Sequence, residues 1–363
     1  MHRALVLEGP RTLRLIDGDD APLGPRDVRL RSLVSGISHG TELNLYRGTS
    51  AFDASGFDRD LRAFVPTDPT VPAYPKQLGY ELIGMVDEVG DGVGELQGGE
   101  LVHAGTPHRE GPVLDLDAAL GATYPLVTLP PGAPPERWLF VSLGAVALVA
   151  LHDARVKVGD HVAVVGLGAI GLLLVQLARL AGAARVTASD PVAERRALAL
   201  ALGADTVLDP LAADGGVGAA LKRAHGAGAD VAVETSGHTA GLQDAIAAAR
   251  LGGTVVTVGF YQGGAPDLRL GEEWHHNRLD MVSSMGAWGA PHRAHPAWDR
   301  PRVMRTVVEL LHTGRLQVDG LPLRRFAFDD AVAAYRWLDE NPDGAVKVAL
   351  AYDGATASGG GER

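Results

Sequence analysis

Three side chains that could handle a proton or a hydroxyl stand close together in VSGISHGTELNLYRG, residues 34–48. Ser38 and Thr41 supply hydroxyls, and His39 supplies an imidazole whose ordinary pKa lies near neutral pH. The chain contains no cysteine, which excludes disulfides, thiolate-bound zinc, iron–sulfur clusters and a thiol nucleophile. The segment raises the question of whether a metal or these side chains move the proton.

A second chemical feature is the stretch VAVVGLGAIG, in which Gly166, Gly168 and Gly171 have the spacing G-x-G-x-x-G. Gly166 permits a tight turn, Gly168 lets the backbone approach a pyrophosphate, and Gly171 lets a helix pack closely on the preceding strand. The unpaired N–H groups at the start of that helix bind phosphates. Because an apolar strand precedes the motif and an apolar helix begins inside it, we predict a dinucleotide site.

The second predicted strand, ARVTASD, ends at Asp190, 19 residues after Gly171. A carboxylate here accepts the ribose hydroxyls and repels a 2′-phosphate, so we expect NAD rather than NADP. Asp190 could instead only cap the next helix, and Arg195 or Arg196 could accommodate the phosphate. The predicted cofactor-binding residues are Gly166, Gly168, Ala169, Ile170, Gly171, Asp190, Arg195, Thr235 and Gly259.

Two patterns of secondary structure must position these groups. A chain of 363 residues is long for a single hydrophobic core, so we expect two domains. The first 130 residues are short, partly alternating runs separated by Gly and Pro, which predicts β-strands. From residue 160 apolar strands alternate with helices, which predicts a parallel, doubly wound sheet and the fold class α/β. Between Thr49 and Pro75 an irregular insert contains four aromatic residues, which favours a packed cover over a flexible linker. The polar tail GATASGGGER is predicted to be disordered.

Composition limits the partners. The net charge is −11 without a Lys/Arg cluster, so we expect no binding to nucleic acid or to anionic membranes. The apolar stretch WLFVSLGAVALVAL has 14 residues, fewer than the roughly 20 that a spanning helix needs. No signal peptide is predicted, and we expect a cytoplasmic protein.

The whole pattern resembles the medium-chain dehydrogenase/reductase superfamily. The matching segments include SGISHGTE, LGYELIGMVDEVG, VKVGDHVAVVGLGAIGLLLVQLARLAGA, VETSG, LGGTVVTVGF and FAFDDAVAAYRWLDENPDGAVKVAL. The resemblance implies a GroES-like β-rich catalytic domain at 1–132 and 300–363, with a doubly wound Rossmann domain at 133–299. It also implies a small-molecule substrate and a homo-oligomer, either a dimer or a tetramer.

Zinc-dependent members hold the metal with a Cys in the first loop, a His in a GHE motif, and a Cys, Asp or Glu before the Rossmann domain. In this sequence Tyr80 replaces the His, Ala145 matches the third ligand, and Ser38 or His39 matches the first. Tyrosine and alanine cannot replace imidazole and carboxylate as zinc ligands. The pattern is instead similar to the zinc-free branch typified by the bacteriochlorophyllide hydroxyethyl dehydrogenases, so we expect no metal.

Without zinc, a hydrogen-bond donor must polarise the substrate oxygen and another group must relay the proton. Tyr80 could be this donor or could only fill the former metal cavity, and His39 could carry the proton or be a surface histidine. By resemblance Thr41 contacts the substrate hydroxyl, although it could only cap a turn. Glu81 is expected to pair with an arginine such as Arg47, or else to orient Tyr80 or His39. The predicted catalytic residues are Tyr80, His39, Thr41, Ser38 and Glu81.

These residues favour an NAD-dependent, zinc-independent enzyme that interconverts a secondary alcohol and a ketone. An NADPH-dependent ene- or quinone reductase is the alternative within enzymes, and Asp190 argues against it. A non-catalytic dinucleotide-binding sensor is the alternative outside enzymes. His108 lies where the resemblance places a pocket-lining residue, but we expect an exposed loop histidine there.

Overall fold

The computed structural model describes residues 2–18, 22–68, 70–286 and 297–352. The chain divides into two compact units, of which the first comprises Met1–Leu139 with Gly320–Arg363 and the second comprises Phe140–Asp319. The predicted boundary at residue 300 differs from this division because helix α9 (Arg300–His312) packs on helix α3 (Val141–Ala154) in the second unit. A Cβ on Gly144 of α3 would lie only 2.5 Å from a methyl of Val307 in α9. The predicted disordered tail lies outside the described residues.

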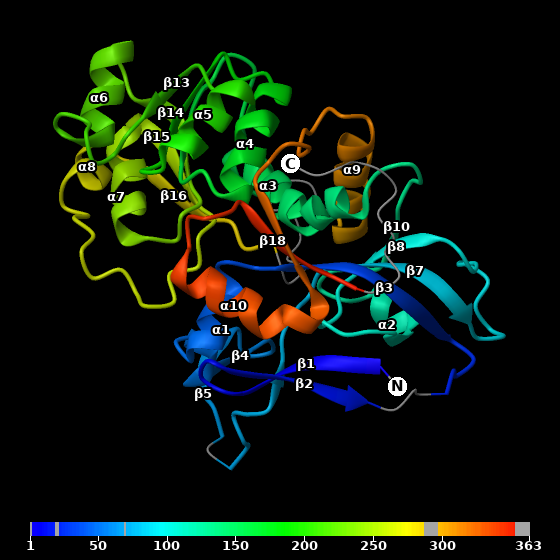
Figure 1. The fold of residues 1–363 in the computed structure, drawn as a ribbon. Coiled ribbons are helices and arrows are strands. Elements are labelled where there is room, and N and C mark those ends of the chain that lie inside the picture. The colour runs from blue at the N-terminus through cyan, green and yellow to red at the C-terminus, as the bar shows by residue number, and fades with distance from the viewer. Residues whose placement is uncertain (1, 19–21, 69, 287–296, 353–363) are drawn as a thin grey trace. The chain divides into compact units, whose positions relative to one another are not determined.

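Strands dominate the first unit, as predicted (Figure 1). One sheet has the order β2-β1-β6, and the largest has the order β10-β8-β7-β3-β18-β17 with β9 beside β3. The strands of these two sheets are β1 (His2–Gly9), β2 (Thr12–Gly18), β3 (Asp27–Ile37), β6 (Lys76–Gln77), β7 (Leu82–Val89), β8 (Leu101–Ala104), β9 (Val113–Asp115), β10 (Val127–Thr128), β17 (Leu323–Ala327) and β18 (Lys347–Ala351). The helices of this unit include α1 (Thr41–Arg47), α2 (Leu116–Leu120) and α10 (Ala331–Glu340), with short 3₁₀ turns η1 (Ala51–Asp53), η2 (Pro135–Phe140) and η3 (Phe328–Asp330).

The centre of the large sheet brings distant parts of the sequence together. Strand β3 pairs on one side with β7 and on the other with β18, antiparallel in both cases. Gly36 in β3 faces Ala349 of β18, and its N–H donates to the Glu81 carbonyl, at 3.0 Å, just before β7 begins. The C-terminal strand therefore lies directly beside the segment that leads into residues 38–42.

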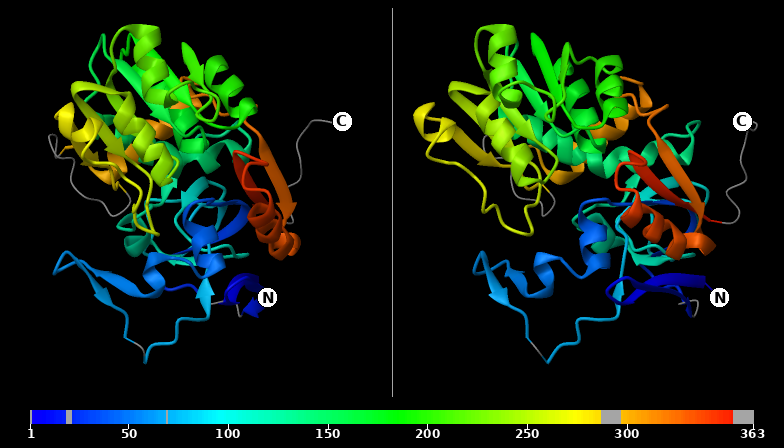
Figure 2. Two further views of the ribbon diagram at one scale, coloured as in Figure 1. Left: turned by 90° about the vertical axis from the view of Figure 1, so that its left-hand side faces the viewer. Right: turned by 60° about the vertical axis from the view of Figure 1, so that its left-hand side comes forward.

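The insert between residues 49 and 75 forms a two-stranded hairpin, β4 (Ser55–Asp58) and β5 (Ala63–Pro66). Both views of Figure 2 show it extending away from the large sheet of its unit. Phe64 contacts Phe52 and Phe57, with ring centroids 5.9 and 5.3 Å apart. Because Phe64 itself is 50% exposed and Leu61 69% exposed, the aromatic residues hold the hairpin together without burying it in the first unit.

The second unit is a six-stranded parallel sheet with the order β13-β12-β11-β14-β15-β16, which confirms the predicted doubly wound fold. Helices cover both faces (Figures 1 and 2), with α3, α4 and α9 packed together and α6 packed on α7. The strands are β11 (His161–Val165), β12 (Arg185–Ser189), β13 (Thr206–Leu208), β14 (Ala229–Glu234), β15 (Ala249–Thr257) and β16 (Asp280–Ser283). The remaining helices are α4 (Ala169–Leu180), α5 (Ala193–Ala201), α6 (Gly216–His225), α7 (Thr239–Ala248) and α8 (Glu273–His276).

One helical stretch of the described residues is long and apolar enough to cross a membrane by length and composition. It runs for 20 residues, from Pro135 to Ala154, because the turn η2 leads directly into α3. The prediction that this segment is too short was therefore wrong. Burial is the better criterion, since 72% of its apolar window is buried inside the protein, as in a core helix.

Candidate active site

The glycine turn, Gly166–Gly171, joins β11 to α4 in the second unit. Gly166 has φ +88°, and a Cβ there would lie 2.7 Å from the Ser236 nitrogen. A Cβ on Gly171 would lie 1.9 Å from the Gly166 carbonyl oxygen, so only glycine permits this contact between helix and strand. At Gly168, the N-cap of α4, a Cβ would have no heavy atom within 4 Å. The turn thus has two glycines required by packing and one that leaves open space at a helix N-terminus, which fits a pyrophosphate.

Asp190 connects the glycine turn to the end of β12. Its Oδ2 accepts a hydrogen bond from the Leu167 N–H at 2.7 Å, and its Oδ1 accepts one from the Val192 N–H at 2.8 Å. Helix α5 has Val192 as its N-cap, so Asp190 lies two residues before the cap position and binds the backbone N–H of the N-cap residue. The carboxylate is 4% exposed and fixed in place, as a group that binds ribose hydroxyls must be.

Two arginines follow Asp190, and only one of them lies beside its carboxylate. Arg195 Nη1 is 4.0 Å from Asp190 Oδ2. Arg196 instead donates to the backbone carbonyls of residues 190 and 191 and pairs with Asp209 at 3.1 Å. Arg196 is therefore already engaged within the unit.

Thr235 and Gly259 follow the neighbouring strands β14 and β15. The Thr235 hydroxyl donates to the Gly166 carbonyl at 2.8 Å, so Thr235 supports the glycine turn. A Cβ on Gly259 would lie 2.4 Å from Gly237 Cα, which requires glycine at this close approach. All the predicted cofactor-binding residues thus lie at or next to the carboxyl ends of β11, β12, β14 and β15, and they fit a dinucleotide.

In the first unit, Tyr80 is the phenol at the position where the resemblance places a metal-binding histidine. Its partly buried ring stacks on Tyr124, with centroids 4.8 Å apart, and its side chain forms a hydrogen bond with that of Ser38. Burial, followed by the charge environment of Tyr124 and Glu81, raises the pKa of Tyr80 well above its ordinary value. The phenol therefore stays protonated near neutral pH and can donate a hydrogen bond, but it cannot act as a base.

Glu81 forms a fully buried ion pair with Lys347 of β18, whereas Arg47 pairs with Asp339. A structural pairing was expected for Glu81, but the predicted partner Arg47 was wrong. A Cβ on Gly36 would lie 2.6 Å from Lys347 Cε and 2.7 Å from Glu81 Oε2, so the glycine lets the lysine cross β3. Burial raises the pKa of Glu81, and Lys347 opposes this rise. The other carboxylate oxygen, Oε1, is buried without a hydrogen-bond partner among the described residues.

A second group of polar side chains lies behind Ser38, and we call it the buried network: Ser35, Glu42, His108, Tyr335 and Tyr352. His108 Nε2 lies 2.9 Å from Glu42 Oε2, and its Nδ1 lies 2.7 Å from the Ser35 hydroxyl. The Tyr335 hydroxyl donates to Glu42, and the Ser35 and Tyr352 hydroxyls are 2.9 Å apart. The prediction of an exposed His108 was wrong, because this side chain is 0% exposed.

The buried network reaches the predicted catalytic loop through Glu42. Its Oε1 accepts a hydrogen bond from the Ser38 N–H at 2.9 Å, which fixes the start of helix α1. Burial alone would raise the pKa of Glu42, but His108 and the hydrogen bonds from Tyr335 and the Ser38 backbone lower it below its ordinary value. Glu42 is thus the charged centre that sets the position of Ser38, although no pattern in the sequence singled it out.

The two remaining predicted residues, His39 and Thr41, follow Ser38 in the same segment. His39 is partly buried, immediately after Ser38. Thr41 is exposed in the first turn of α1, and its N–H lies 3.5 Å from the Ser38 hydroxyl. Ser38 and Tyr80 are therefore the predicted residues that the structure brings into direct contact, while Thr41 contacts Ser38 through its backbone.

The side chains at the family's zinc-ligand positions do not fit a zinc ion. Ser38 offers a hydroxyl, Tyr80 a phenol that stays protonated, and the buried Ala145 of α3 only a methyl. Within the described ranges, His, Asp and Glu residues form no group of three or more that could hold a metal. The side chains at these positions therefore do not support a metal-dependent step.

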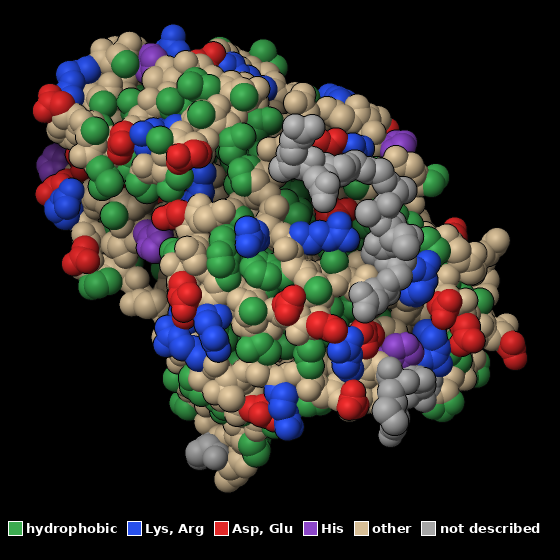
Figure 3. Space-filling model, viewed as in Figure 1, with side chains coloured by type: hydrophobic (Ala, Val, Ile, Leu, Met, Phe, Trp, Pro, Cys, Tyr) green, Lys and Arg blue, Asp and Glu red, His purple; other side chains and the backbone are tan. Residues whose placement is uncertain are grey.

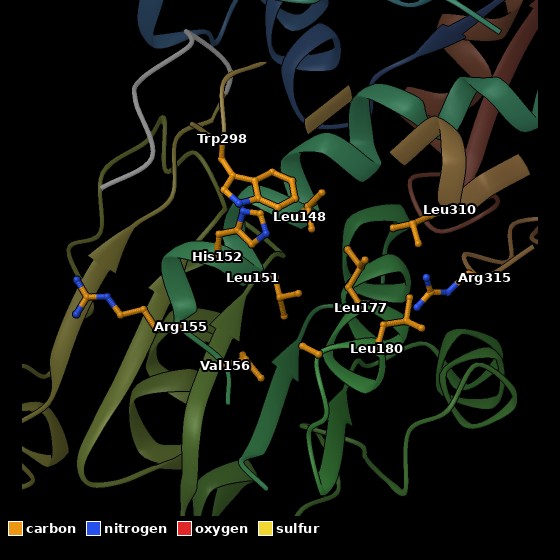
Figure 4. A pocket seen from close by; sticks show the side chains of 11 residues that line it. Leu148, Leu151, His152, Arg155, Val156, Leu177, Leu180, Trp298, Leu310 and Arg315 are labelled. Atoms are coloured by element: carbon orange, nitrogen blue, oxygen red, sulfur yellow. The ribbon is translucent and has the colours of Figure 1, made fainter. Parts of the chain in front are cut away.

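A cavity of about 410 Å³ lies in the second unit between α3, α4 and α9 (Figure 4). Its lining is largely apolar and includes Leu148, Leu151, Leu177, Leu180, Trp298 and Leu310. It contacts the C-terminal part of α4, whereas the glycine turn lies at the N-terminal end of that helix. This cavity is therefore separate from the dinucleotide site.

On the face seen in Figure 3, Lys and Arg side chains are interspersed with Asp and Glu, so that face has no continuous basic surface.

The chain is similar in sequence and in fold to known dehydrogenases. Residues 169–300 match the family model "Zinc-binding dehydrogenase". D-guloside 3-dehydrogenase of Escherichia coli (strain K12) is 33% identical over 356 residues, which cover 96% of this chain and all of that protein. (R,R)-butanediol dehydrogenase of Bacillus subtilis (strain 168) is 32% identical over 89% of this chain and 91% of its own length. The crystal structure of 2R,3R-butanediol dehydrogenase from Bacillus subtilis has the same fold, with a TM-score of 0.76 at 24% identity over 97% of this chain and 99% of that one.

Proposed function

The chain belongs to the medium-chain zinc-binding dehydrogenase superfamily, and from this premise we propose that it oxidises a secondary alcohol to a ketone, or the reverse, without zinc. Its relatives are NAD(P)-dependent oxidoreductases that act on alcohols or sugars. We therefore set aside the alternative of a non-catalytic dinucleotide-binding sensor. The observation that carries the proposal is the placement of the Tyr80 phenol, which is hydrogen-bonded to Ser38 and stacked on Tyr124 at the position of a family zinc ligand.

For the substrate we propose a polyol, a sugar-like ring or a related natural-product intermediate with a secondary hydroxyl. A relative that spans nearly the whole chain is named for oxidising position 3 of a D-guloside, which supports a ring hydroxyl. No relative reported above is named as an ene- or quinone reductase, so nothing favours that alternative.

The bound nicotinamide would accept or supply the hydride. The protein must then manage the oxygen of the reacting carbon. We assign Tyr80 as the donor of a hydrogen bond to that oxygen, because its raised pKa keeps the proton on the phenol. Ser38 and the stacked ring of Tyr124 fix the direction of the hydroxyl.

A separate group must take the proton, because a phenol with a raised pKa is a poor base. We assign this role to His39, whose imidazole titrates near neutral pH in its ordinary state and which follows Ser38 directly. Thr41 is proposed to contact the substrate hydroxyl. Glu81, paired with Lys347, is proposed to support Tyr80 through its charge and backbone position and not by proton transfer.

We propose NAD as the preferred cofactor, supported by the fixed carboxylate of Asp190 and by the engagement of Arg196 with Asp209. Asp190→Ala should weaken NADH binding and reduce discrimination against NADPH. Tenfold or tighter binding of NADPH over NADH by the native protein, about 1.4 kcal/mol, would contradict the assignment. A homo-oligomer, dimer or tetramer, and a cytoplasmic location stay predictions.

The test of the proton path compares Tyr80→Phe and His39→Ala on a panel of sugars and polyols. Each variant should lose about 100-fold in turnover while NADH affinity stays near native. Tyr74→Phe is the control, because it removes a phenol hydroxyl elsewhere in the same unit. Elemental analysis of the active protein should give well below one zinc per chain. Activity that depends on stoichiometric zinc, or native turnover in both variants with chemistry rate-limiting, would overturn the proposal.

A further inference from the structure

Glu234, the last residue of β14, is a buried carboxylate that the proposed reaction does not use. Its Oε1 accepts hydrogen bonds from the Ser236 N–H at 2.5 Å, from the Ser236 hydroxyl, and from the Gly237 N–H at 3.0 Å. The Tyr261 hydroxyl donates to Oε2. Burial raises the pKa of Glu234 and these hydrogen bonds oppose the rise. A carboxylate at 0% exposure costs folding free energy, so its presence calls for a function.

The carboxylate joins the loop after β14 to the loop after β15, and each of these two loops contains a residue of the predicted dinucleotide site. The loop after β14 lies against the glycine turn, since a Cβ on Gly166 would lie 2.7 Å from the Ser236 nitrogen. Tyr261 ties Glu234 to the loop after β15, which contains Gly259. A Cβ on Gly259 would lie 2.8 Å from Glu234 Oε2, and one on Gly241 in α7 would lie 3.0 Å from Oε1. Glycines therefore make the space in which Glu234 meets its donors.

The strand order assigns this assembly to one half of the dinucleotide. In a doubly wound sheet the ligand lies across the point where the strand order reverses, here between β11 and β14. Asp190 lies on the β12 side, where the adenosine ribose is expected. Glu234 and Tyr261 lie on the β14–β15 side, which leaves the nicotinamide half for them. Their hydrogen bond fixes the two loops that border that half.

We propose that Glu234 and Tyr261 are positioning residues for the nicotinamide half of the coenzyme, acting through the backbone of Ser236–Gly237 and of Gly259. Neither side chain needs to touch the coenzyme. The loops that follow β14 and β15 are held in one arrangement before binding, so less ordering is required when the coenzyme binds. The inference rests on dinucleotide binding and is independent of the zinc-free proton path.

The test measures binding of two ligands, NADH and ADP-ribose, to the full chain without substrate. ADP-ribose lacks the nicotinamide but keeps the adenosine and the pyrophosphate. Tyr261→Phe and Glu234→Gln should each weaken NADH binding about tenfold, the worth of one hydrogen bond to a charged group, and change ADP-ribose binding less than threefold. Asp244→Asn is the control, because Asp244 is a partly buried carboxylate in α7 of the same unit whose burial raises its pKa to about 6, and within the described residues it has no hydrogen bond to these loops.

The comparison of the two ligands separates positioning from a general loss of structure. A purely structural role predicts equal losses for NADH and ADP-ribose together with a lower melting temperature, and that result would overturn the proposal. Unchanged NADH binding in both variants would overturn it as well. Should Glu234→Gln fail to fold, Tyr261→Phe decides, because it removes a single hydroxyl and keeps the ring. Since no turnover is measured, failure of the proposed reaction would not affect the result.

Discussion

The glycine turn of the second unit is made of backbone, whereas the buried network and the Glu81–Lys347 pair of the first unit are made of side chains. At Gly168 a Cβ would have no protein atom within 4 Å, so packing does not require glycine at this part of the turn, and the proposed pyrophosphate site accounts for it. Glu81, Glu42 and His108, in contrast, are buried. Glu42 pairs with His108, and Glu81 pairs with Lys347 of the neighbouring strand β18. We therefore expect binding and stability to be separable in the second unit and coupled in the first.

The largest effect on stability is expected when the positive charge that pairs with Glu81 is removed. Lys347→Met should lower the free energy of unfolding by about 3–5 kcal/mol, because it leaves a carboxylate buried without its partner. Urea unfolding at pH 7 measures the loss. The double variant Lys347→Met/Glu81→Gln is the control and should recover much of it, since no unpaired charge then remains. A loss below about 1 kcal/mol in the single variant would show that the first unit does not depend on this pair.

A smaller effect is expected where binding can be separated from stability. Gly168→Ala should leave unfolding within about 0.5 kcal/mol of the native protein, because the new methyl meets no atom. It should weaken NADH binding about 30-fold, or ~2 kcal/mol, because the methyl occupies space that the pyrophosphate needs. Fluorescence titration and thermal unfolding measure the two quantities.

Gly171→Ala, three residues further on, is the matched contrast. Its Cβ would lie 1.9 Å from the Gly166 carbonyl oxygen, so the helix must move away from the strand and stability should fall together with binding. If Gly168→Ala bound NADH as tightly as the native protein does, the glycine turn would not be the pyrophosphate site.

The two regions also differ in how far the sequence reveals them. The glycine turn was predicted residue by residue, because its function depends on spacing within six residues and on the strand and helix at either side. The alternation of strands and helices predicted the doubly wound sheet for the same reason. Local patterns suffice where neighbours in the sequence are also neighbours in space.

The buried network could not be predicted this way. Glu42 meets His108 from 66 residues away and Tyr335 from 293 residues away. Lys347 reaches Glu81 only because β18 pairs with β3, a strand order that no local pattern indicates. His108 stands between Pro107 and Arg109, and a polar segment of this kind is typical of an exposed loop. Its burial follows from tertiary contacts alone.

The smallest expected effect concerns the charge of Glu42 and depends on pH. The folded-state pKa of Glu42 is lowered below its ordinary value of about 4.5, so folding favours the ionised form. This contribution is fully present above the unfolded-state pKa and is lost as the pH falls through the lower folded-state pKa. Glu42→Gln keeps the shape and one acceptor but removes the charge. It should therefore cost about 1.5 kcal/mol at pH 7, and the difference from the native protein should shrink below about pH 4.5.

Urea unfolding of both proteins between about pH 3 and pH 7 tests this, with Gly168→Ala as the control. That control alters the glycine turn without changing any titratable group, so its curve should run parallel to the native one. A Glu42→Gln difference that stays constant over the whole range would mean that the pKa of Glu42 is the same in the folded and unfolded states, and one that shrinks as the pH rises above about 4.5 would mean that Glu42 is not ionised in the folded protein. The Tyr335 hydroxyl and the Ser38 N–H would then donate to a neutral carboxyl group, and the start of α1 would be fixed by shape and not by charge. A difference that disappears on acidification would instead show that Ser38, and with it Tyr80, is held by a buried negative charge.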